Sequence, residues 1–374
     1  MEAGGAYALA FASGSSTTAT VLQSLGPNAH VISVNDVYGG TFRYMRRVAS
    51  ENQGLETTFL DLERATDNEI ISSFRENTKV CPRFTVLIYA VLLTLLSQLV
   101  WIESPTNPTL RLIDIKRIAH LAHSHPSRPL VLVDNTFLSP FYSSPLLLGA
   151  DIVLHSLTKY INGHSDVVMG ALILPESNTK LAEKLRFLQN AIGAVPSPYD
   201  CWLAQRGAKT LHLRMKQHGL NALAVARALE SAEGVEEVIY PGLPGKTEAS
   251  RRKYELAWSV LSSHARKFIG AEEGDRPPVD GFPFSGMISF RIRGGFDEAE
   301  KFLTSTRLFT LAESLGGVES LAEHPAKMTH GSIPPTERAL LGIGDNLIRL
   351  SVGVEDHEDL VQDILHAVHV STGL

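Results

Sequence analysis

The chain has 374 residues, of which 44% are hydrophobic and 20% charged, which is typical of a globular protein with a large core and here predicts two domains. Its formal net charge of −6 excludes the strongly basic balance of nucleic-acid-binding proteins. Two cysteines, Cys81 and Cys201, are too few for a disulfide framework or a cysteine metal cluster, so we expect a reducing, cytoplasmic setting. The N-terminus lacks the basic region of a signal peptide.

Apolar segments of strand length alternate with helical segments through the first half of the chain. Such alternation predicts an α/β domain with a mostly parallel sheet, which we assign to residues 1–210. Strands are expected at residues 7–13, 30–34, 55–60, 100–103, 129–134, 152–154 and 169–174, and helices at 70–76, 113–123 and 181–189.

The pattern changes in the second half. A long helical run is predicted from about Asp200 through Glu230. After it, residues 287–292 and 347–352 alternate between apolar and polar side chains, as half-buried strands do. These segments predict a smaller C-terminal α+β domain over residues 211–374.

One lysine follows directly on a predicted buried strand. The apolar residues 152–154 run into a polar turn that holds Ser156, Thr158 and Lys159. Desolvation at such a position disfavours the ammonium, lowers the pKa of the lysine and makes its amine a usable nucleophile. We therefore expect Lys159 to form a Schiff base with pyridoxal 5′-phosphate (PLP).

A PLP site also needs an acid for the pyridinium nitrogen, an anion seat for the phosphate and a cation for the substrate carboxylate. Asp134 ends the most apolar predicted strand, and Gly14 and Ser15 open a helix whose free N–H groups can bind phosphate. Arg349 lies on the last predicted strand, and Asn107 projects from a loop that two prolines stiffen. Taken singly, each residue fits an ordinary cap, turn or packing position as well.

Alternative interpretations of the same motifs are weaker. Ser156 to Lys159 match the S-x-x-K pattern of penicillin-binding proteins, but the S-D-N and K-T-G motifs of that class do not occur in the sequence. Residues 245–247 end like a Walker A loop, yet Tyr240 stands where that loop requires glycine. Tyr38, beside paired glycines, could stack on a flat cofactor or simply pack. No spacing of histidine, cysteine or carboxylate residues indicates a metal site.

Several blocks together resemble the Cys/Met-metabolism PLP enzymes of fold type I. The segment SLTKYINGHSDVVMG at 156–170 is similar to the PLP-lysine signature of that family. The blocks AFASG (10–14), DVYGG (36–40), ESPTNP (103–108) and VDNTF (133–137) are similar to its other motifs. The resemblance implies the fold type I architecture, PLP as cofactor and a cytoplasmic homotetramer built as a dimer of dimers, with neither nucleic acid nor membrane as a partner.

Position by position, the resemblance implies roles for twelve residues. Lys159 would hold the cofactor and later shuttle protons, and Tyr38 would stack on the cofactor ring and assist proton transfer. The remaining cofactor-binding residues would be Gly14, Ser15, Asp134, Thr136, Ser156 and Thr158. The substrate-binding residues would be Asn107, Glu313, Ser314 and Arg349.

Three further blocks, at 186–198, 287–292 and 306–317, are most similar to a fungal type of the branch that cleaves cystathionine. The implied activity is γ-elimination of L-cystathionine to L-cysteine, 2-oxobutanoate and ammonia, a lyase step of transsulfuration and cysteine biosynthesis. The synthase or a related sulfhydrylase is the alternative within the family, and a truncated, inactive gene product is the alternative of another class.

The sequence departs from the family at two places. Members carry a longer N-terminal segment whose Tyr-x-Arg pair reaches the phosphate in the neighbouring subunit, and without it we expect weaker PLP binding and weaker tetramer assembly. The apolar insert at 81–99 has no counterpart in the family. It is long enough for a membrane span, but it interrupts the approach to a strand, so we favour a retained intron. Transcripts that join Val80 directly to Val100 would test this interpretation.

Overall fold

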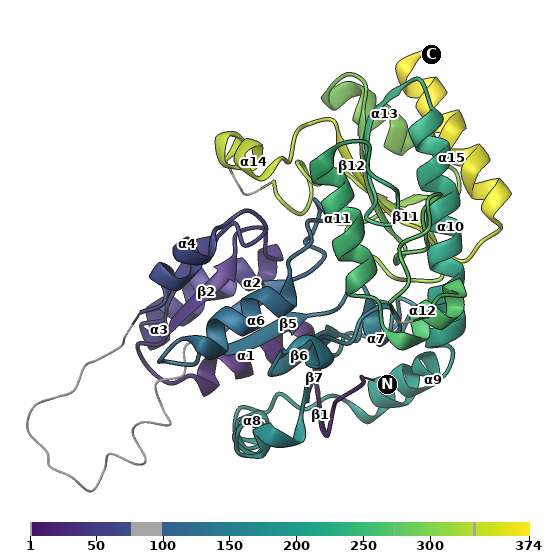
Figure 1. The fold of residues 1–374 in the computed structure, drawn as a ribbon. Coiled ribbons are helices and arrows are strands. Elements are labelled where there is room, and N and C mark those ends of the chain that lie inside the picture. The colour runs from purple at the N-terminus through teal and green to yellow at the C-terminus, as the bar shows by residue number, and fades with distance from the viewer. Residues whose placement is uncertain (1, 76–98, 273, 332–333) are drawn as a thin grey trace, which may run out of the picture.

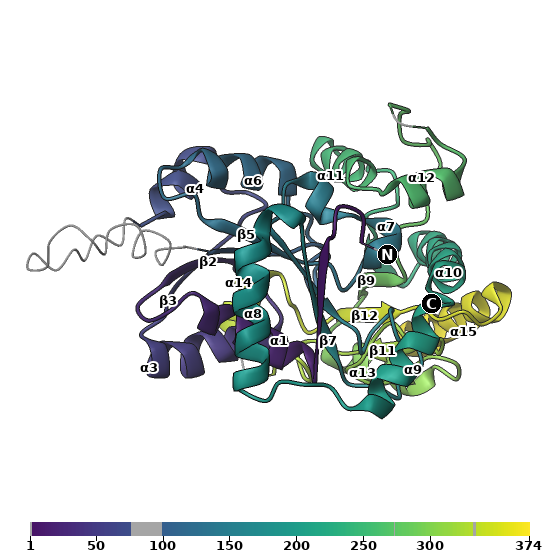
Figure 2. The same cartoon turned by 90° about the horizontal axis from the view of Figure 1, so that it is seen from below.

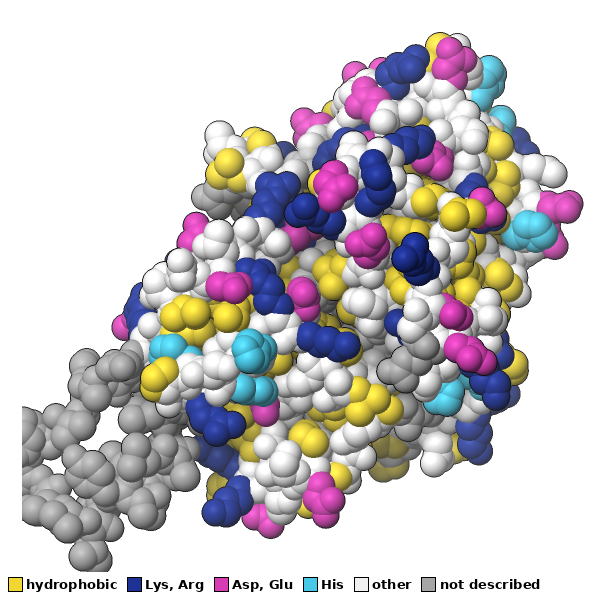
Figure 3. Space-filling model, in the orientation of Figure 1, with side chains coloured by type: hydrophobic (Ala, Val, Ile, Leu, Met, Phe, Trp, Pro, Cys, Tyr) yellow, Lys and Arg dark blue, Asp and Glu magenta, His cyan; other side chains and the backbone are white. Residues whose placement is uncertain are grey.

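Two β-sheets, one of seven strands and one of five, organise the fold (Figure 1). The computed structural model describes residues 2–75, 99–272, 274–331 and 334–374. Within these ranges, no helix has the length and apolar character needed to cross a membrane. On the face drawn in Figure 3, basic and acidic side chains are interspersed rather than segregated, so this face carries no extended field of one sign.

The seven-stranded sheet has the order β1-β7-β6-β5-β4-β2-β3. The strands from β6 to β3 run parallel, whereas β7 is antiparallel to both β6 and β1. The predicted mostly parallel α/β sheet is therefore confirmed. Its strands are β1 (Tyr7–Phe11), β2 (His30–Val34), β3 (Glu56–Leu60), β4 (Leu99–Glu103), β5 (Leu130–Asp134), β6 (Ile152–Ser156) and β7 (Gly170–Leu174).

Helices cover both faces of this sheet (Figure 2). In α6, Ile115, Ile118, Ala119 and Ala122 are buried at the spacing of one helix face, which packs on β5. The helices of this part are α1 (Gly14–Ser24), α2 (Gly39–Arg43), α3 (Ser50–Gln53), α4 (Asp67–Ser73), α6 (Ile115–Ser124), α7 (Ser139–Tyr142), α8 (Thr179–Ala191) and α9 (Pro198–Ala208), with a π-helix (Tyr44–Ala49) between α2 and α3 and 3-10 helices at Pro145–Leu148 and Glu176–Asn178.

The five-stranded sheet has the order β10-β11-β12-β9-β8 and is antiparallel except between β10 and β11. This smaller sheet confirms the predicted second α+β unit. Its strands are β8 (Val235–Ile239), β9 (Met287–Ile292), β10 (Thr310–Leu311), β11 (Leu321–Glu323) and β12 (Leu347–Ser351), and its helices are α10 (Leu211–Ser231), α11 (Glu248–Ser259), α12 (Ser263–Ile269), α13 (Phe296–Ser305), α14 (Pro335–Leu341) and α15 (His357–Thr372). Helices α10 and α15 lie side by side (Figure 1).

The prediction of one helical run from about residue 200 to 230 is wrong, because two separate helices, α9 and α10, occupy this range. The break follows Ala208, next to Gly207, where a Cβ atom would lie 2.1 Å from the carbonyl oxygen of Asn162. The Gly207 carbonyl accepts hydrogen bonds from the backbone N–H of Thr210 at 3.1 Å and from the Arg214 guanidinium at 2.8 Å, so the α-helical pattern stops there. The domain boundary between residues 210 and 211 stays a prediction.

The apolar insert predicted at 81–99 lies, up to residue 98, outside the described residues. Its final residue belongs to the sheet, because Leu99 begins β4, is fully buried and pairs with Val31 of β2 and Leu130 of β5. The strand predicted at 100–103 therefore begins one residue earlier than expected.

Candidate active site

The parallel strands β2, β4, β5 and β6 end at one edge of the large sheet, where α/β proteins bind ligands. A cavity of about 560 Å³ opens at this edge and is closed on its other side by segments next to β11 and β12. The structure brings all twelve predicted site residues together around this cavity. They are Gly14, Ser15, Tyr38, Asn107, Asp134, Thr136, Ser156, Thr158, Lys159, Glu313, Ser314 and Arg349.

Lys159 lies just beyond β6 and is largely buried, as its position after an apolar strand predicts. Its Nζ donates a hydrogen bond to the Oγ of Ser314, 3.1 Å away. Burial, reinforced by the positive charge of Arg349 and opposed by Glu323, lowers the pKa of Lys159 to about 8. The amine can therefore release and accept a proton near neutral pH.

Asp134 ends β5, and its carboxyl faces the cavity beside Thr136. Its Oδ1 accepts from the Thr136 backbone N–H at 3.0 Å and from the Thr136 hydroxyl at 2.5 Å. The same hydroxyl accepts the backbone N–H of Ser156 at 2.9 Å, which ties the end of β5 to the end of β6. Burial raises the pKa of Asp134, against the opposing effects of Thr136 and His155.

The first turn of α1 forms a second wall of the cavity. Ser13 caps the helix by accepting the backbone N–H of Ser16 at 2.9 Å. Gly14 lies against Ser156, since a Cβ atom on Gly14 would be 3.6 Å from the Ser156 side chain. Free N–H groups at this helix end, together with the hydroxyls of Ser15 and Ser156, make a suitable seat for a phosphate group.

Arg349 is 1% exposed and lies on β12 opposite Glu323 of β11, with which it forms an ion pair. Its Nη1 donates to the Oδ1 of Asn107 at 2.9 Å, and its Nη2 donates to the backbone carbonyls of Glu313 and Ser314 at 2.9 and 3.0 Å. Burial lowers the pKa of Arg349 and raises that of Glu323, in each case against the effect of the partner charge. The buried Nε has no hydrogen-bond partner among the described residues.

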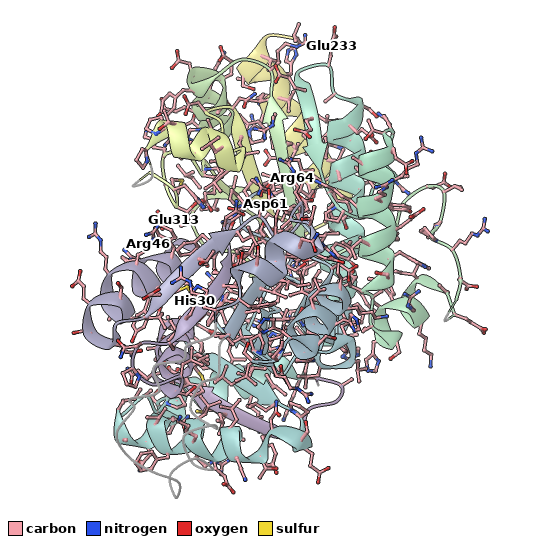
Figure 4. All side chains as sticks on the ribbon, turned by 60° about the vertical axis from the view of Figure 1, so that its left-hand side comes forward. His30, Arg46, Asp61, Arg64, Glu233 and Glu313 are labelled. Atoms are coloured by element: carbon pink, nitrogen blue, oxygen red, sulfur yellow. The ribbon has the colours of Figure 1, made fainter. Side chains whose placement is uncertain are left out.

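Tyr38 is half-exposed at the cavity wall. Its ring rests on Gly40, where a Cβ atom would lie 2.5 Å from the Tyr38 Cε1. Glu313 is exposed at the cavity mouth, and Figure 4 shows it where the C-terminal half of the chain meets the N-terminal half.

Sequence reasoning missed several cavity residues and one close partner of the site. Glu103 ends β4 as Asp134 ends β5, so the same signal, a carboxylate after an apolar strand, could have found it. Arg43 and Thr329 line the cavity from segments whose sequence gives no such signal. Glu323 reaches Arg349 only through the pairing of β11 with β12, which a local pattern does not reveal.

The residues present fit PLP. A buried amine of lowered pKa, a carboxyl at the end of the neighbouring strand, a helix N-terminus with hydroxyls and the Arg349 guanidinium all line one cavity. The cavity volume lies within the range of about 300–1,000 Å³ that small-molecule sites occupy.

Comparisons with known proteins agree with this fit. The profile of the Cys/Met metabolism PLP-dependent enzyme family matches residues 1–82, 90–269 and 280–369, so one of its two gaps falls inside the insert predicted at 81–99. The chain is 50% identical over 370 residues to cystathionine gamma-lyase of Saccharomyces cerevisiae, covering 98% of this chain and 82% of that protein. It is 48% identical over 373 residues to cystathionine gamma-lyase of Homo sapiens, covering 99% and 80%.

A solved structure of cystathionine gamma-lyase from yeast superposes with a TM-score of 0.81 at 47% identity, covering 98% of this chain and 82% of that one. The comparisons confirm the resemblance found in the sequence, the fold and the PLP cofactor. The chain therefore belongs to the Cys/Met metabolism PLP-dependent enzyme family.

Proposed function

We propose that the protein is a carbon–sulfur lyase that catalyses the γ-elimination of L-cystathionine, yielding L-cysteine, 2-oxobutanoate and ammonia in transsulfuration. One observation carries the proposal. The amine of Lys159, whose pKa is lowered, and the guanidinium of Arg349 line the same cavity. The identities of 48–50% with proteins named cystathionine gamma-lyase favour this reaction over the synthase and sulfhydrylase alternatives.

We assign the cofactor to one wall of the cavity. Asp134, oriented by Thr136, would hold the pyridinium nitrogen, and Tyr38 would stack on the ring. Gly14 and Ser15, with the hydroxyls of Ser156 and Thr158, would hold the phosphate. When bound, PLP supplies an electron sink for negative charge that develops next to the substrate amino group.

The α-carboxylate of the substrate is assigned to Arg349 and its neighbours. The Arg349 guanidinium lines the cavity and can donate charge-assisted hydrogen bonds, which are stronger than neutral ones. The same guanidinium donates hydrogen bonds to the Asn107 side chain and to the Ser314 backbone carbonyl. These two contacts fix the orientation of the guanidinium. Binding at this point would orient the substrate Cα and Cβ toward Lys159.

Proton transfer is assigned to the Nζ of Lys159. With a pKa of about 8, this amine can accept a proton from carbon and return it within one catalytic cycle. The Ser314 hydroxyl at 3.1 Å holds the amine in place, and Tyr38, which lines the same cavity, would assist.

The distal end of cystathionine carries both an ammonium and a carboxylate. Two exposed side chains of opposite charge, Glu313 and Arg43, lie at the cavity mouth. We assign Glu313 to the distal ammonium and Arg43 to the distal carboxylate, which together would favour this substrate over one with an apolar end.

We further propose a cytoplasmic homotetramer. Large apolar side chains of α8, α9 and their connection are exposed, and an assembled oligomer would cover them. They are Phe187, Ile192, Val195, Tyr199 and Trp202. Analytical ultracentrifugation of the PLP-loaded protein would give four times the chain mass if the proposal is right, and the chain mass alone would contradict it.

Two assays test the reaction. The PLP-loaded protein should release 2-oxobutanoate from L-cystathionine faster than it forms cystathionine from an acylated homoserine and cysteine. Replacement of Lys159 by alanine should abolish 2-oxobutanoate release while the protein remains folded. Faster synthesis than cleavage would overturn the lyase assignment in favour of the synthase.

A further inference from the structure

Two buried carboxylates connect the loop that carries Tyr38 with the loop that carries Asn107. Strands β2 and β4 are parallel neighbours, so residues 35–38 and 104–111 leave the sheet at the same edge. Tyr38 and Asn107 both line the cavity. The relative position of the two loops therefore sets how far Tyr38 lies from Asn107 across the cavity.

The first connection starts at Asp36, which is 1% exposed. Its Oδ2 accepts hydrogen bonds from the hydroxyl of Thr106 at 2.9 Å and from that of Thr109. These two threonines stand on either side of Asn107 in the sequence. A buried carboxylate is strongly destabilised when it loses its hydrogen-bond donors. The two threonine hydroxyls therefore hold the Asn107 loop against Asp36.

The second connection runs in the opposite direction. Glu103 ends β4, is 6% exposed, and its Oε2 accepts the backbone N–H of Tyr38 at 2.9 Å. Burial and the neighbouring Asp134 raise the pKa of Glu103 well above its ordinary value, whereas the N–H groups of Tyr38 and Asn107 lower it. The Asn107 loop thus hydrogen-bonds to Asp36 of the Tyr38 loop, and the Tyr38 loop hydrogen-bonds to Glu103 at the end of β4.

These connections extend to groups proposed to contact the cofactor and the substrate. Asn107 accepts a hydrogen bond from Arg349 at 2.9 Å, so a displaced Asn107 loop would leave a buried guanidinium donor unpaired. The Tyr38 ring packs on Gly40, and its place follows from the backbone that Glu103 holds.

We propose that Asp36 and Glu103 are positioning residues that brace the Tyr38 loop and the Asn107 loop against each other. The proposal rests on the function proposed above, in which Tyr38 stacks on the cofactor and Arg349 binds the substrate carboxylate. The brace acts through those residues and not on the reacting atoms.

The test compares Thr109→Val and Asp36→Asn with the control Thr372→Val. Valine has the shape of threonine without its hydroxyl, and the Thr372 hydroxyl bonds only within α15, to the Val368 carbonyl at 2.8 Å. We expect Thr109→Val and Asp36→Asn to weaken the visible circular dichroism of bound PLP and to raise the KM for L-cystathionine about tenfold, with a smaller effect on kcat. Thr372→Val should leave all three quantities unchanged.

A double variant separates a shared brace from two unrelated defects. Adding Thr109→Val to Asp36→Asn should raise the KM by less than the product of the two single effects, because Asp36→Asn weakens and Thr109→Val removes the same hydrogen bond. The proposal would be overturned if the two substitutions multiplied each other's effects on the KM. It would also be overturned if both single variants kept the wild-type dichroism and KM. If Asp36→Asn fails to fold, Thr109→Val, which loses one hydroxyl, decides alone.

Hydrogen exchange of the cofactor-free protein distinguishes failure of the brace from failure of the proposed function. Thr109→Val should speed amide exchange in residues 104–111 and at Tyr38, and unchanged exchange there would overturn the brace. A wild-type protein that binds no PLP would instead contradict the proposed function.

Discussion

Replacing Glu323 by glutamine removes the negative charge that faces Arg349. The two side chains are 0% and 1% exposed and lie opposite each other on β11 and β12. Removal of one partner from a buried ion pair leaves an uncompensated buried charge and destabilises a protein by about 3–5 kcal/mol. Glutamine can still accept the Thr329 hydroxyl, so we expect Glu323→Gln to lower the free energy of unfolding by about 3 kcal/mol.

Thermal unfolding of the cofactor-free protein measures this effect. A loss of about 3 kcal/mol should lower the Tm by roughly 4 °C in a chain of this size. The matched control is Glu300→Gln, because Glu300 forms a 2.9 Å ion pair with Lys327 whose side chains are 55% and 58% exposed. Such a surface pair contributes at most about 1 kcal/mol. Equal Tm values for Glu323→Gln and Glu300→Gln would refute the reasoning.

Three other substitutions or conditions give distinct outcomes. Reductive methylation mapped by mass spectrometry should modify Lys159 half-maximally near pH 8, its lowered pKa; half-maximal modification only near pH 10.4, the ordinary value of a lysine side chain, would contradict the lowered value. Asp134→Asn should weaken PLP binding by about tenfold or more in a fluorescence titration, through loss of a charge-assisted hydrogen bond, and unchanged affinity would remove Asp134 from the site. Gly207→Ala places a Cβ atom 2.1 Å from the Asn162 carbonyl oxygen and should lower the Tm by several degrees, whereas a Tm equal to wild type would show that the α9–α10 turn relaxes at no cost.

The features that the sequence could predict are those with a local physical cause. Lys159 and Asp134 each end an apolar segment, and the carboxyl ends of parallel strands meet at one edge, so their convergence follows from the strand pattern alone. The alternation of β12 likewise predicts which face Arg349 occupies before any partner is known.

Contacts between distant parts of the chain could not be predicted in this way. Asn107 and Arg349 are 242 residues apart in the sequence, and the strand of Glu323 is only three residues long. Strands this short carry too few residues for a periodic signal. The break after Ala208 lies beside the close approach of Gly207 to Asn162, a contact that only the tertiary structure supplies.

The proposed function depends on Lys159 holding PLP in this cavity. Borohydride reduction of the loaded protein fixes the cofactor to the amine that holds it, and peptide mass spectrometry then identifies that residue. We predict a single labelled peptide that contains Lys159. A label on any other lysine, or none on protein that has been saturated with PLP, would contradict the assignment of this cavity as the active site.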